Sequence, residues 1–315
     1  MQLLSLEETR NALPFPALLE ALDEGFRAEC TSPLRHHHFM ENANGAADVL
    51  LLMPAWQNAG WGGVKIVNVH PGNADLGLPA ISSSYILFDR KTGQHKLILD
   101  GGELTARRTA AASALAAKRI ARPDSSHLLV VGSGRVAANI PHAYRAALPI
   151  ETVSVWNRTA ANAERLAENL RAEGIDAKPV DDLERAVGKA DIISCATLSK
   201  EPVVKGAWLK PGQHVDLIGS FTPQMREVDD EAVQRASVYI DTDHAKVESG
   251  DIAVPLQSGV IADADICGTL LDLCRDNRNP RKSDDEITLF KGVGTAIEDL
   301  AAAILAAKLV AGHRS

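Results

Sequence analysis

Residues Leu128–Ala137 read Leu-Leu-Val-Val-Gly-Ser-Gly-Arg-Val-Ala, an apolar run followed at once by two closely spaced glycines. The run predicts a buried strand over His127–Val131, and a helix is expected to follow the glycines. A strand, a Gly-x-Gly-x-x-Ala loop and a helix N-terminus together can hold the pyrophosphate of a dinucleotide. Gly132 would make the tight turn, Gly134 would admit the phosphates, and Ala137 would let helix and strand pack closely.

The loop residues that we expect to touch a bound dinucleotide are Gly132, Ser133, Gly134, Arg135, Val136 and Ala137. A structural glycine turn in another doubly wound fold is the alternative interpretation. Pro141 falls inside the expected helix, where it should kink the helix or remove one hydrogen bond.

The next strand along the chain ends in the polar segment Asn157-Arg158-Thr159. A domain for NAD usually carries Asp or Glu here to bind the ribose 2′-hydroxyl, whereas a domain for NADP carries a nearby Arg. The segment has no carboxylate to repel a 2′-phosphate, and Arg158 has the planar fork that matches phosphate geometry. We therefore expect NADPH as cofactor, with NADH possible but weaker. A solvated arginine at the strand end is the alternative.

Short apolar strands alternate with helices through the middle of the chain. Further strands are expected over Glu151–Trp156, Asp191–Ala196, His214–Ile218 and Ser237–Ile240. Such alternation predicts right-handed crossovers and a parallel sheet. The fold class is therefore α/β, a Rossmann doubly wound parallel sheet, and we place the NADP-binding domain at residues 122–285.

The two ends of the chain have a different, mixed α+β character. The expected elements are a helix over Phe15–Cys30, strands over Asp48–Met53 and Lys65–Val69, a hairpin from Ser83–Asp89 to Lys96–Leu99, and Ala-rich helices over Leu104–Ala121 and Leu289–Ala311. We expect residues 286–315 to pack back on residues 1–121, forming a discontinuous α+β domain for substrate binding and dimerisation.

Composition narrows the class of protein. The chain has 315 residues and a net charge of −8, so nonspecific nucleic-acid binding is not expected. No apolar run approaches the roughly 20 residues of a membrane span, and the first residues are acidic where a signal peptide would be basic. The four cysteines form no Cys-x-x-Cys pair and are expected to be small buried hydrophobes. We expect a cytoplasmic protein.

Several basic residues upstream of the glycine loop are candidates for a substrate site. Lys65 opens an apolar strand, where it could donate to a substrate or shuttle a proton, although a snorkelling lysine is the preferred interpretation from the residues alone. Arg107 and Arg108 start a helix, so only one of them should enter a given pocket, where it could clamp a carboxylate. Arg35 is a third candidate. The adjacent His36-His37-His38 diverge, and we expect no metal site.

Taken together, these segments resemble the ornithine cyclodeaminase/mu-crystallin family over nearly the whole chain. The segments that carry the resemblance are Lys65-Ile-Val-Asn, Pro71-Gly-Asn, Ile98-Leu-Asp-Gly-Gly, Leu104-Thr-Ala-Arg-Arg-Thr-Ala-Ala-Ala-Ser, the glycine loop, Trp156-Asn-Arg-Thr and Phe290-Lys-Gly-Val-Gly-Thr-Ala-Ile-Glu-Asp. The family implies a homodimer that acts on small amino acids and cyclic imines. Its substrate and dimerisation domain is discontinuous and surrounds a Rossmann domain.

The resemblance also implies roles for individual residues. It makes Lys65 the active-site lysine, which reverses the preference stated above, and it makes Arg108 the group that holds the substrate carboxylate, with Arg35 as a second contact. Thr109 and Thr197 complete the expected cofactor contacts. Arg108 could instead reach the cofactor phosphates.

One departure from the family pattern concerns the reaction. Cyclodeaminases of the family carry a catalytic Asp in the loop after the fifth Rossmann strand, and Phe221 stands at the position that looks equivalent. Phenylalanine accepts no proton and pairs with no ammonium, so ornithine cyclisation is disfavoured. The segment Gly-Ser-Phe-Thr-Pro-x-Met-Arg-Glu is similar to the same segment in the family branch that reduces Δ1-pyrroline-2-carboxylate and Δ1-piperideine-2-carboxylate.

These points lead to a functional hypothesis. We expect NADPH-dependent reduction of a cyclic ketimine carboxylate to L-proline or L-pipecolate by a homodimer, with Lys65 and Arg108 as catalytic residues and Arg35, Lys65, Arg108 and Phe221 around the substrate. An L-alanine-type dehydrogenase and an ornithine cyclodeaminase are the enzymatic alternatives. A binding protein for NADPH and small ligands, of the mu-crystallin type, is the non-enzymatic one.

Overall fold

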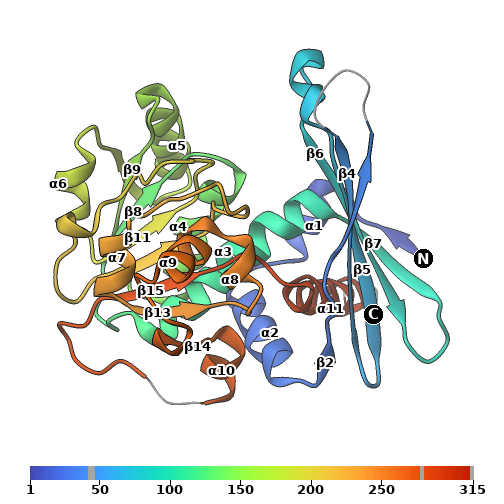
Figure 1. Cartoon of the computed structure of the whole chain (residues 1–315). Coiled ribbons are helices and arrows are strands. Elements are labelled where there is room, and N and C mark those ends of the chain that lie inside the picture. Colours follow the sequence, from blue (N-terminus) through green and yellow to red (C-terminus); the bar gives the residue numbers. More distant parts are fainter. Residues whose placement is uncertain (42–46, 277–279, 313–315) are drawn as a thin grey trace. The chain divides into compact units, whose positions relative to one another are not determined.

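The computed structural model of the chain describes residues 1–41, 47–276 and 280–312. The chain forms two compact units (Figure 1). Unit 1 comprises Met1–Arg108 with Thr295–Ser315, and unit 2 comprises Thr109–Gly294. Unit 1 is therefore discontinuous in sequence, and helix α3 (Gly101–Ile120) contributes residues to both units.

The described part of unit 1 is built on a seven-stranded sheet with the order β1-β7-β6-β5-β4-β2, with β3 also paired to β4. Its strands are β1 (Gln2–Leu3), β2 (Cys30–Thr31), β3 (His36–Met40), β4 (Asp48–Gln57), β5 (Trp61–Val69), β6 (Ile81–Asp89) and β7 (His95–Asp100). All neighbours pair antiparallel except β1 and β7. The predicted hairpin is confirmed as β6–β7, and Gly93 (φ 70°) supplies the left-handed turn residue that a β-carbon would strain.

Helices cover one face of this sheet. The helices of unit 1 are α1 (Leu6–Asn11), α2 (Phe15–Arg27), the 3₁₀ segment η1 (Pro71–Leu76) and α11 (Ala296–Gly312), together with the first part of α3. Phe15, Leu18, Leu19, Leu22 and Phe26 recur at helical spacing on α2 and are all buried, which explains its amphipathic sequence. Helix α11 packs against α2 and against β4, β5 and β6, so its residues are apolar on nearly all sides.

Unit 2 contains an eight-stranded sheet over its described residues, in the order β10-β9-β8-β11-β12-β15-β13-β14, and every neighbouring pair is parallel. Its strands are β8 (His127–Val131), β9 (Thr152–Trp156), β10 (Asp176–Pro179), β11 (Ile192–Cys195), β12 (His214–Leu217), β13 (Ser237–Ile240), β14 (Ile266–Thr269) and β15 (Thr288–Lys291). The order reverses between β8 and β11, which is the switch point of a doubly wound sheet. The predicted Rossmann fold class is confirmed.

Helices lie on both faces of this parallel sheet (Figure 1). They are α4 (Arg135–Ala147), α5 (Ala160–Ala172), α6 (Leu183–Val187), α7 (Asp230–Arg235), α8 (Ala245–Glu248), α9 (Gly250–Ser258) and α10 (Leu270–Arg275), with the 3₁₀ segments η2 (Gly206–Trp208) and η3 (Asp263–Asp265). Helix α4 passes through Pro141 without ending, and Pro141 itself is buried. Helix α3 and strand β15 extend unit 2 beyond the predicted segment 122–285, and the function assigned to each domain stays a prediction.

The prediction of a helix from Leu289 onward is wrong at its start. Thr288–Lys291 forms strand β15, and the helix begins only at Ala296. All four strand residues are buried between β12 and β13, and a short, fully buried strand shows no alternation that distinguishes it from a helix.

The cysteine prediction is half wrong. Cys195 and Cys274 are buried, but Cys30 is half-buried and Cys267 is exposed, and all four are free thiols. The expected cytoplasmic location stays a prediction.

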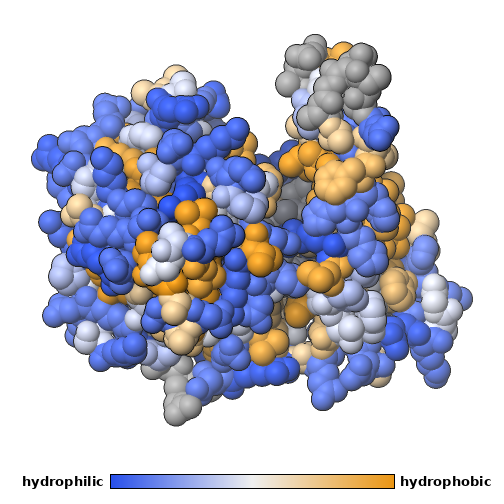
Figure 2. Space-filling model, in the orientation of Figure 1, coloured by the Kyte–Doolittle hydropathy of each residue, from blue (hydrophilic) through white to orange (hydrophobic). Residues whose placement is uncertain are grey.

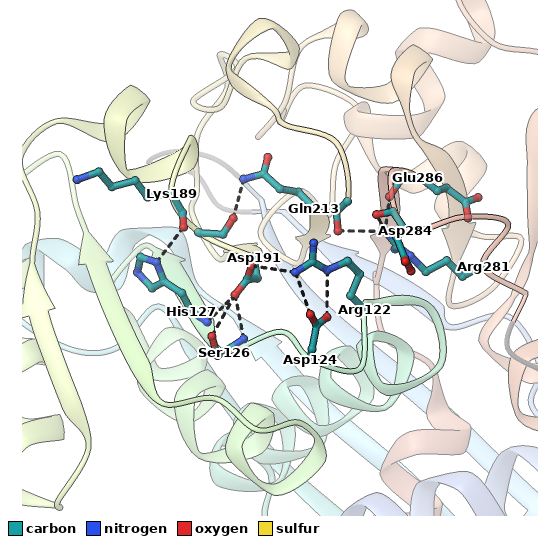
Figure 3. A network of polar contacts seen from close by, with 12 residues as sticks. Arg122, Asp124, Ser126, His127, Lys189, Asp191, Gln213, Arg281, Asp284 and Glu286 are labelled. Carbon is teal, nitrogen blue, oxygen red and sulfur yellow. Dashed lines mark hydrogen bonds and ion pairs between the residues drawn. The ribbon is translucent and has the colours of Figure 1, made fainter.

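A polar network holds the amino ends of the unit 2 strands together (Figure 3). Asp191 accepts hydrogen bonds from the backbone N–H groups of Ser126 and His127, both at 2.9 Å. The Arg281 guanidinium donates to the carbonyl oxygens of Ile120, Gly212, Asp284 and Glu286. The network pairs backbone N–H and C=O groups that have no partner within the sheet. It lies at the end of the sheet opposite the glycine loop.

Candidate functional site

Lys65 lies inside unit 1 in the middle of strand β5, and its side chain is 3% exposed. Its ammonium group is 2.9 Å from Oδ2 of Asp299 on α11 and donates to Oδ1 at 3.0 Å. A weaker contact of 3.4 Å reaches Oγ1 of Thr105 on α3. The interpretation of Lys65 as a snorkelling residue at a strand end is therefore wrong, because the side chain is buried and paired.

Arg108, the last residue of the first part of unit 1, joins the same cluster. Its Nε donates to Oδ1 of Asp299 at 2.9 Å, and its Nη1 donates to Oε2 of Glu298 at 2.6 Å. All four charged side chains are at most 5% exposed. Two cations and two anions thus form one buried group without net charge, which limits the cost of burying charge. We call Lys65, Arg108, Glu298 and Asp299 the acid–cation cluster.

Burial and neighbouring charges shift the protonation of this cluster. Burial, reinforced by the charge of Arg108, lowers the pKa of Lys65 to about 8, although Asp299 opposes the shift. Burial would raise the pKa of Asp299, but Lys65 and Arg108 outweigh it and hold that pKa below its usual value. A lysine with a pKa near neutrality can hold or release a proton under physiological conditions, which a solvated lysine rarely does.

Arg108 still has hydrogen-bonding capacity toward a ligand. A guanidinium has five N–H groups, and the contacts to Asp299 and Glu298 use one each on Nε and Nη1. The two acids therefore orient the guanidinium.

The other basic candidates of unit 1 lie in different surroundings. Arg107 donates to the carbonyl oxygen of Leu13 and stacks over the ring of Phe15, so its role is in packing. Arg35 is half-buried, and its charge contributes to lowering the pKa of Lys65. The three histidines His36–His38 lie exposed on β3, where side chains point alternately to opposite faces.

In unit 2, the glycine loop has the geometry that the sequence predicts. Gly132 has φ 126°, and a β-carbon there would lie 2.5 Å from the carbonyl oxygen of Ala196. Gly134 is exposed, forms the N-cap of α4 without a side-chain hydrogen bond, and a β-carbon on it would meet nothing within 4 Å. The start of α4 thus presents open backbone N–H groups that fit a pyrophosphate. Ser133 and Arg135–Ala137 complete this loop and the first turn of α4.

The segment after β9 lies beside the loop. Nδ2 of Asn157 donates to Oγ of Ser133 at 2.8 Å, and Oδ1 of Asn157 accepts the N–H of Thr159 at 2.9 Å. Arg158 is exposed. These contacts fix Asn157 between the two loops, and Arg158 is exposed beside it, so the residues present fit the ribose of a dinucleotide.

The loops after β11 and β12 form the other half of this sheet edge. Thr197 follows β11, and Gly219 follows β12. A β-carbon on Gly219 would lie 1.8 Å from the carbonyl oxygen of Thr197, so only glycine permits this approach. Phe221, two residues on, is 51% exposed at the surface of unit 2. Thr109, the remaining predicted contact, is half-buried on α3.

Three acids of these sites, Glu227, Glu298 and Asp299, were not predicted from the sequence. Glu298 and Asp299 stand in a segment quoted for the resemblance, but they were given no role there. Two adjacent acids in an otherwise apolar helix need buried cations to neutralise them, and that requirement is the signal that could have identified them. Glu227, which binds the loops after β11 and β12, has no comparable signal, because its partners there are two backbone N–H groups and the Thr197 hydroxyl, none of them charged.

Two features are absent from the residues that the structure describes. Within residues 1–41, 47–276 and 280–312, no three His, Cys, Asp or Glu side chains are placed to hold a metal ion. In the same part of the chain, no helix is both long and apolar enough to cross a membrane.

Known proteins match nearly the whole chain. The model of the ornithine cyclodeaminase/mu-crystallin family matches residues 2–311. A Δ1-pyrroline-2-carboxylate reductase of Paracoccus denitrificans is 42% identical over 90% of this chain and 93% of its own length. The solved structure of Thermococcus litoralis Δ1-pyrroline-2-carboxylate reductase with NADH and L-proline is 33% identical, with a TM-score of 0.92 over 99% of this chain and 98% of that one.

A dimeric archaeal alanine dehydrogenase with bound NAD is 30% identical to the chain, with a TM-score of 0.89 over 99% of this chain and 97% of that one. The acid–cation cluster in unit 1, the glycine loop in unit 2 and these matches lead to one identification. The chain belongs to the ornithine cyclodeaminase/mu-crystallin family.

Proposed function

We propose that the chain reduces the C=N bond of a cyclic ketimine carboxylate with NADPH, forming L-proline from Δ1-pyrroline-2-carboxylate and L-pipecolate from Δ1-piperideine-2-carboxylate. Its family and its relatives that are named reductases make the chain an NAD(P)H-dependent oxidoreductase acting on C=N bonds. The ring size and the choice of dinucleotide are the finer parts of the proposal.

The observation that carries the proposal is the pair Lys65 and Arg108 in the acid–cation cluster. Arg108 offers N–H groups to a carboxylate, and the low pKa of Lys65 lets it hold the proton that the imine nitrogen requires. A protonated imine is the better electrophile, and a positioned carboxylate fixes which face of the ring reacts. Arg35 would add a second contact to the carboxylate.

Unit 2 holds the dinucleotide in this proposal. Reduced nicotinamide, when bound, supplies the hydride that the imine carbon accepts. The chain's own contribution is the open N-terminus of α4 for the pyrophosphate and Asn157, Arg158 and Thr159 for the ribose, with Ser133, Thr109 and Thr197 as further contacts. The preference for NADPH rests on Arg158, which is exposed in a segment without a carboxylate.

Phe221 supports a compact ring as substrate. Its exposed ring offers apolar surface rather than a proton acceptor. Proline, which is bound in the Thermococcus litoralis reductase, is a product of this size. An open-chain substrate, as alanine dehydrogenases use, is the second candidate, and the similarity to the archaeal alanine dehydrogenase is the observation that favours it.

A homodimer is also proposed, and it rests on the sheet of unit 1. Pro54, Val64, Ile86 and Ile98 lie directly opposite one another across β4, β5, β6 and β7, on the face that does not carry Lys65. All four side chains are only half-buried. Figure 2 shows apolar residues at the surface of this unit along its sheet. A second copy would cover such a row.

The proposal is tested by initial rates of dinucleotide oxidation. Δ1-pyrroline-2-carboxylate, Δ1-piperideine-2-carboxylate and pyruvate with ammonia are each offered with NADPH and with NADH. We expect turnover of at least one cyclic imine without added ammonia, and a higher kcat/KM with NADPH. Turnover of pyruvate with ammonia alone would establish the second candidate. Tight NADPH binding with no turnover of any substrate would indicate a binding protein instead.

A further inference from the structure

A second buried charged group lies at the carboxyl edge of the unit 2 sheet. Glu227 is fully buried in the segment that leads from the loop after β12 to α7. Its Oε1 accepts hydrogen bonds from the backbone N–H of Thr197 at 2.7 Å and from the Thr197 hydroxyl at 2.9 Å. Its Oε2 accepts the backbone N–H of Gly219 at 2.6 Å. One carboxylate therefore joins the loop after β11 to the loop after β12.

Buried partners hold Glu227 in this orientation. Oδ1 of Asp251 on α9 accepts the backbone N–H of Glu227 at 2.7 Å and that of Val228 at 3.2 Å. The fully buried Lys291 on β15 donates to the carbonyl oxygen of Leu217, at the end of β12, at 3.1 Å, and lies 3.8 Å from Oδ2 of Asp251. Burial raises the pKa of Glu227, while Lys291 and the N–H groups of Thr197 and Gly219 oppose that rise. Both oxygens of Glu227 accept hydrogen bonds from N–H or O–H donors, and these contacts favour its ionised form.

The two loops also approach each other closely. A β-carbon on Gly219 would lie 1.8 Å from the carbonyl oxygen of Thr197 and 2.5 Å from Oε1 of Glu227. The rest of the loop after β12 is closed on itself, because Oγ of Ser220 donates to the carbonyl oxygen of Met225 and lies 2.8 Å from Oγ of Ser249. Phe221 is thus presented on a loop whose base is fixed by Glu227.

The loops that Glu227 joins lie at the carboxyl edge of the sheet, where a dinucleotide binds in this fold. In a doubly wound sheet the dinucleotide lies across the carboxyl ends of the strands at the switch point, here between β8 and β11. The loops after β8 and β9 take the adenosine half, which leaves the loops after β11 and β12 to the nicotinamide half.

We propose that Glu227 is a positioning residue for the nicotinamide half of the dinucleotide, acting through the Thr197 and Gly219 loops that it joins. This inference rests on the proposed function, since it assumes that unit 2 holds a nicotinamide dinucleotide. Glu227 touches neither dinucleotide nor substrate. It sets the distance between two loops that do.

Glu227→Gln tests the proposal with little change of volume. An amide group must turn its NH₂ toward one of the two loops, where it faces an N–H donor instead of accepting from it. We expect the Kd for the reduced dinucleotide, measured by fluorescence titration without imine, to rise on the order of tenfold. Amide hydrogen exchange in residues 196–199 and 218–221 should become faster. The KM for the imine at saturating dinucleotide should change much less than that Kd.

Two further variants serve as a control and as a second test. Glu201→Gln removes an exposed acid near the same loops, and it should bind and exchange like the unaltered chain. Glu227→Asp keeps the negative charge beside Lys291 but is one methylene shorter, so it tests the same contact if Glu227→Gln does not fold. We expect Glu227→Asp to weaken dinucleotide binding severalfold and to accelerate exchange in at least one of the two segments.

The proposal is overturned if Glu227→Asp, or a folded Glu227→Gln, binds the dinucleotide as the unaltered chain does and shows unchanged exchange in both segments. It is equally overturned if exchange is faster throughout unit 2, because Glu227 would then serve general stability. If the unaltered chain bound neither NADPH nor NADH, the proposed function itself would fail. The exchange measurement would still show whether Glu227 fixes the two loops.

Discussion

In unit 1, the carboxylate of Asp299 lies within 3.0 Å of two different cationic side chains, Lys65 and Arg108. Removing one member of a buried ion group leaves its partner uncompensated, which costs roughly 3–5 kcal/mol. Because Asp299 raises the pKa of Lys65 against the effect of burial, it stabilises the protonated lysine. Asp299 therefore connects the stability of unit 1 with the protonation of Lys65.

The sign of this linkage follows from the direction of each shift. The pKa of Lys65 falls from 10.5 to about 8 in the folded chain. Burying the charged lysine therefore lowers the folding stability. This loss of stability is fully present below pH 8 and disappears as the pH rises toward 10.5. The pKa of Asp299 is lowered, so its contribution to stability is present above its unfolded value and is lost as the pH falls through the folded one.

Asp299→Asn should change the pH dependence of the reaction. If protonated Lys65 serves the imine, kcat/KM for reduction should fall as the pH rises through about 8. The variant lowers the pKa of Lys65 further, so this fall should move to lower pH, and kcat/KM at its best pH should drop on the order of 100-fold. A pH–rate profile and the melting temperature would measure both effects.

Glu20→Gln is the matched control, since Glu20 is an exposed acid on α2 of the same unit. Its profile should follow that of the unaltered chain. An Asp299→Asn profile that falls at the same pH as that of the unaltered chain would separate Asp299 from the protonation of Lys65.

Among the elements, the loop between β8 and α4 was the most predictable from sequence. Two glycines after a buried strand indicate a backbone conformation that other residues cannot adopt. Gly132 has a positive φ, and its α-carbon lies too close to Ala196 for a side chain. Strand β15 was not predictable, because its four buried residues carry no alternation and stand only four residues before an apolar helix. The pairing of Lys65 with Asp299 was equally hidden, since it depends on which segments of the fold meet.

Gly134→Ala separates binding from folding at this loop. The backbone of Gly134 is extended (φ −77°, ψ −175°), and a β-carbon there meets nothing within 4 Å, so the chain itself tolerates alanine. The added methyl group would occupy the space that a pyrophosphate needs. We expect an unchanged melting temperature without ligand and a dinucleotide Kd raised on the order of tenfold or more.

Gly188→Ala provides the comparison for that variant. Gly188 ends α6 with φ −66°, and a β-carbon there would make only ordinary contacts, the shortest at 3.6 Å. Dinucleotide binding should be unaffected. Equal affinity of Gly134→Ala and the unaltered chain would move the pyrophosphate away from this loop.

For the whole molecule, the sequence predicted the Rossmann fold class, and comparison with known proteins identified the family. The apolar row across β4 to β7 could not be predicted from the sequence. A strand that carries apolar residues on both faces has the pattern of a fully buried strand, so the pattern does not show that one face is exposed. The row has meaning only once the strand register places Val64 opposite Pro54 and Ile86.

The dimer predicts a concentration-dependent mass. Ile86→Lys places a charge in the middle of the apolar row, so the variant should be monomeric where the unaltered chain is dimeric. Sedimentation velocity over a range of concentrations would measure the change. Glu168→Lys, which adds the same side chain at an exposed position of α5, should leave the mass unchanged. A monomeric unaltered chain would remove this part of the proposal.

The discontinuity of unit 1 also has a consequence for synthesis on the ribosome. Lys65 and Asp299 are separated by 234 positions, so strand β5 leaves the exit tunnel long before its counter-ion has been translated. Until α11 emerges, Lys65 and Arg108 have no buried anion from that helix to pair with, and water must keep them solvated. The sheet of unit 1 therefore closes over its cations only after α11 has emerged, and by then the whole of unit 2, which ends at Gly294, has been synthesised. A nascent chain that stalls before Asp299 would retain an open, unfinished first unit.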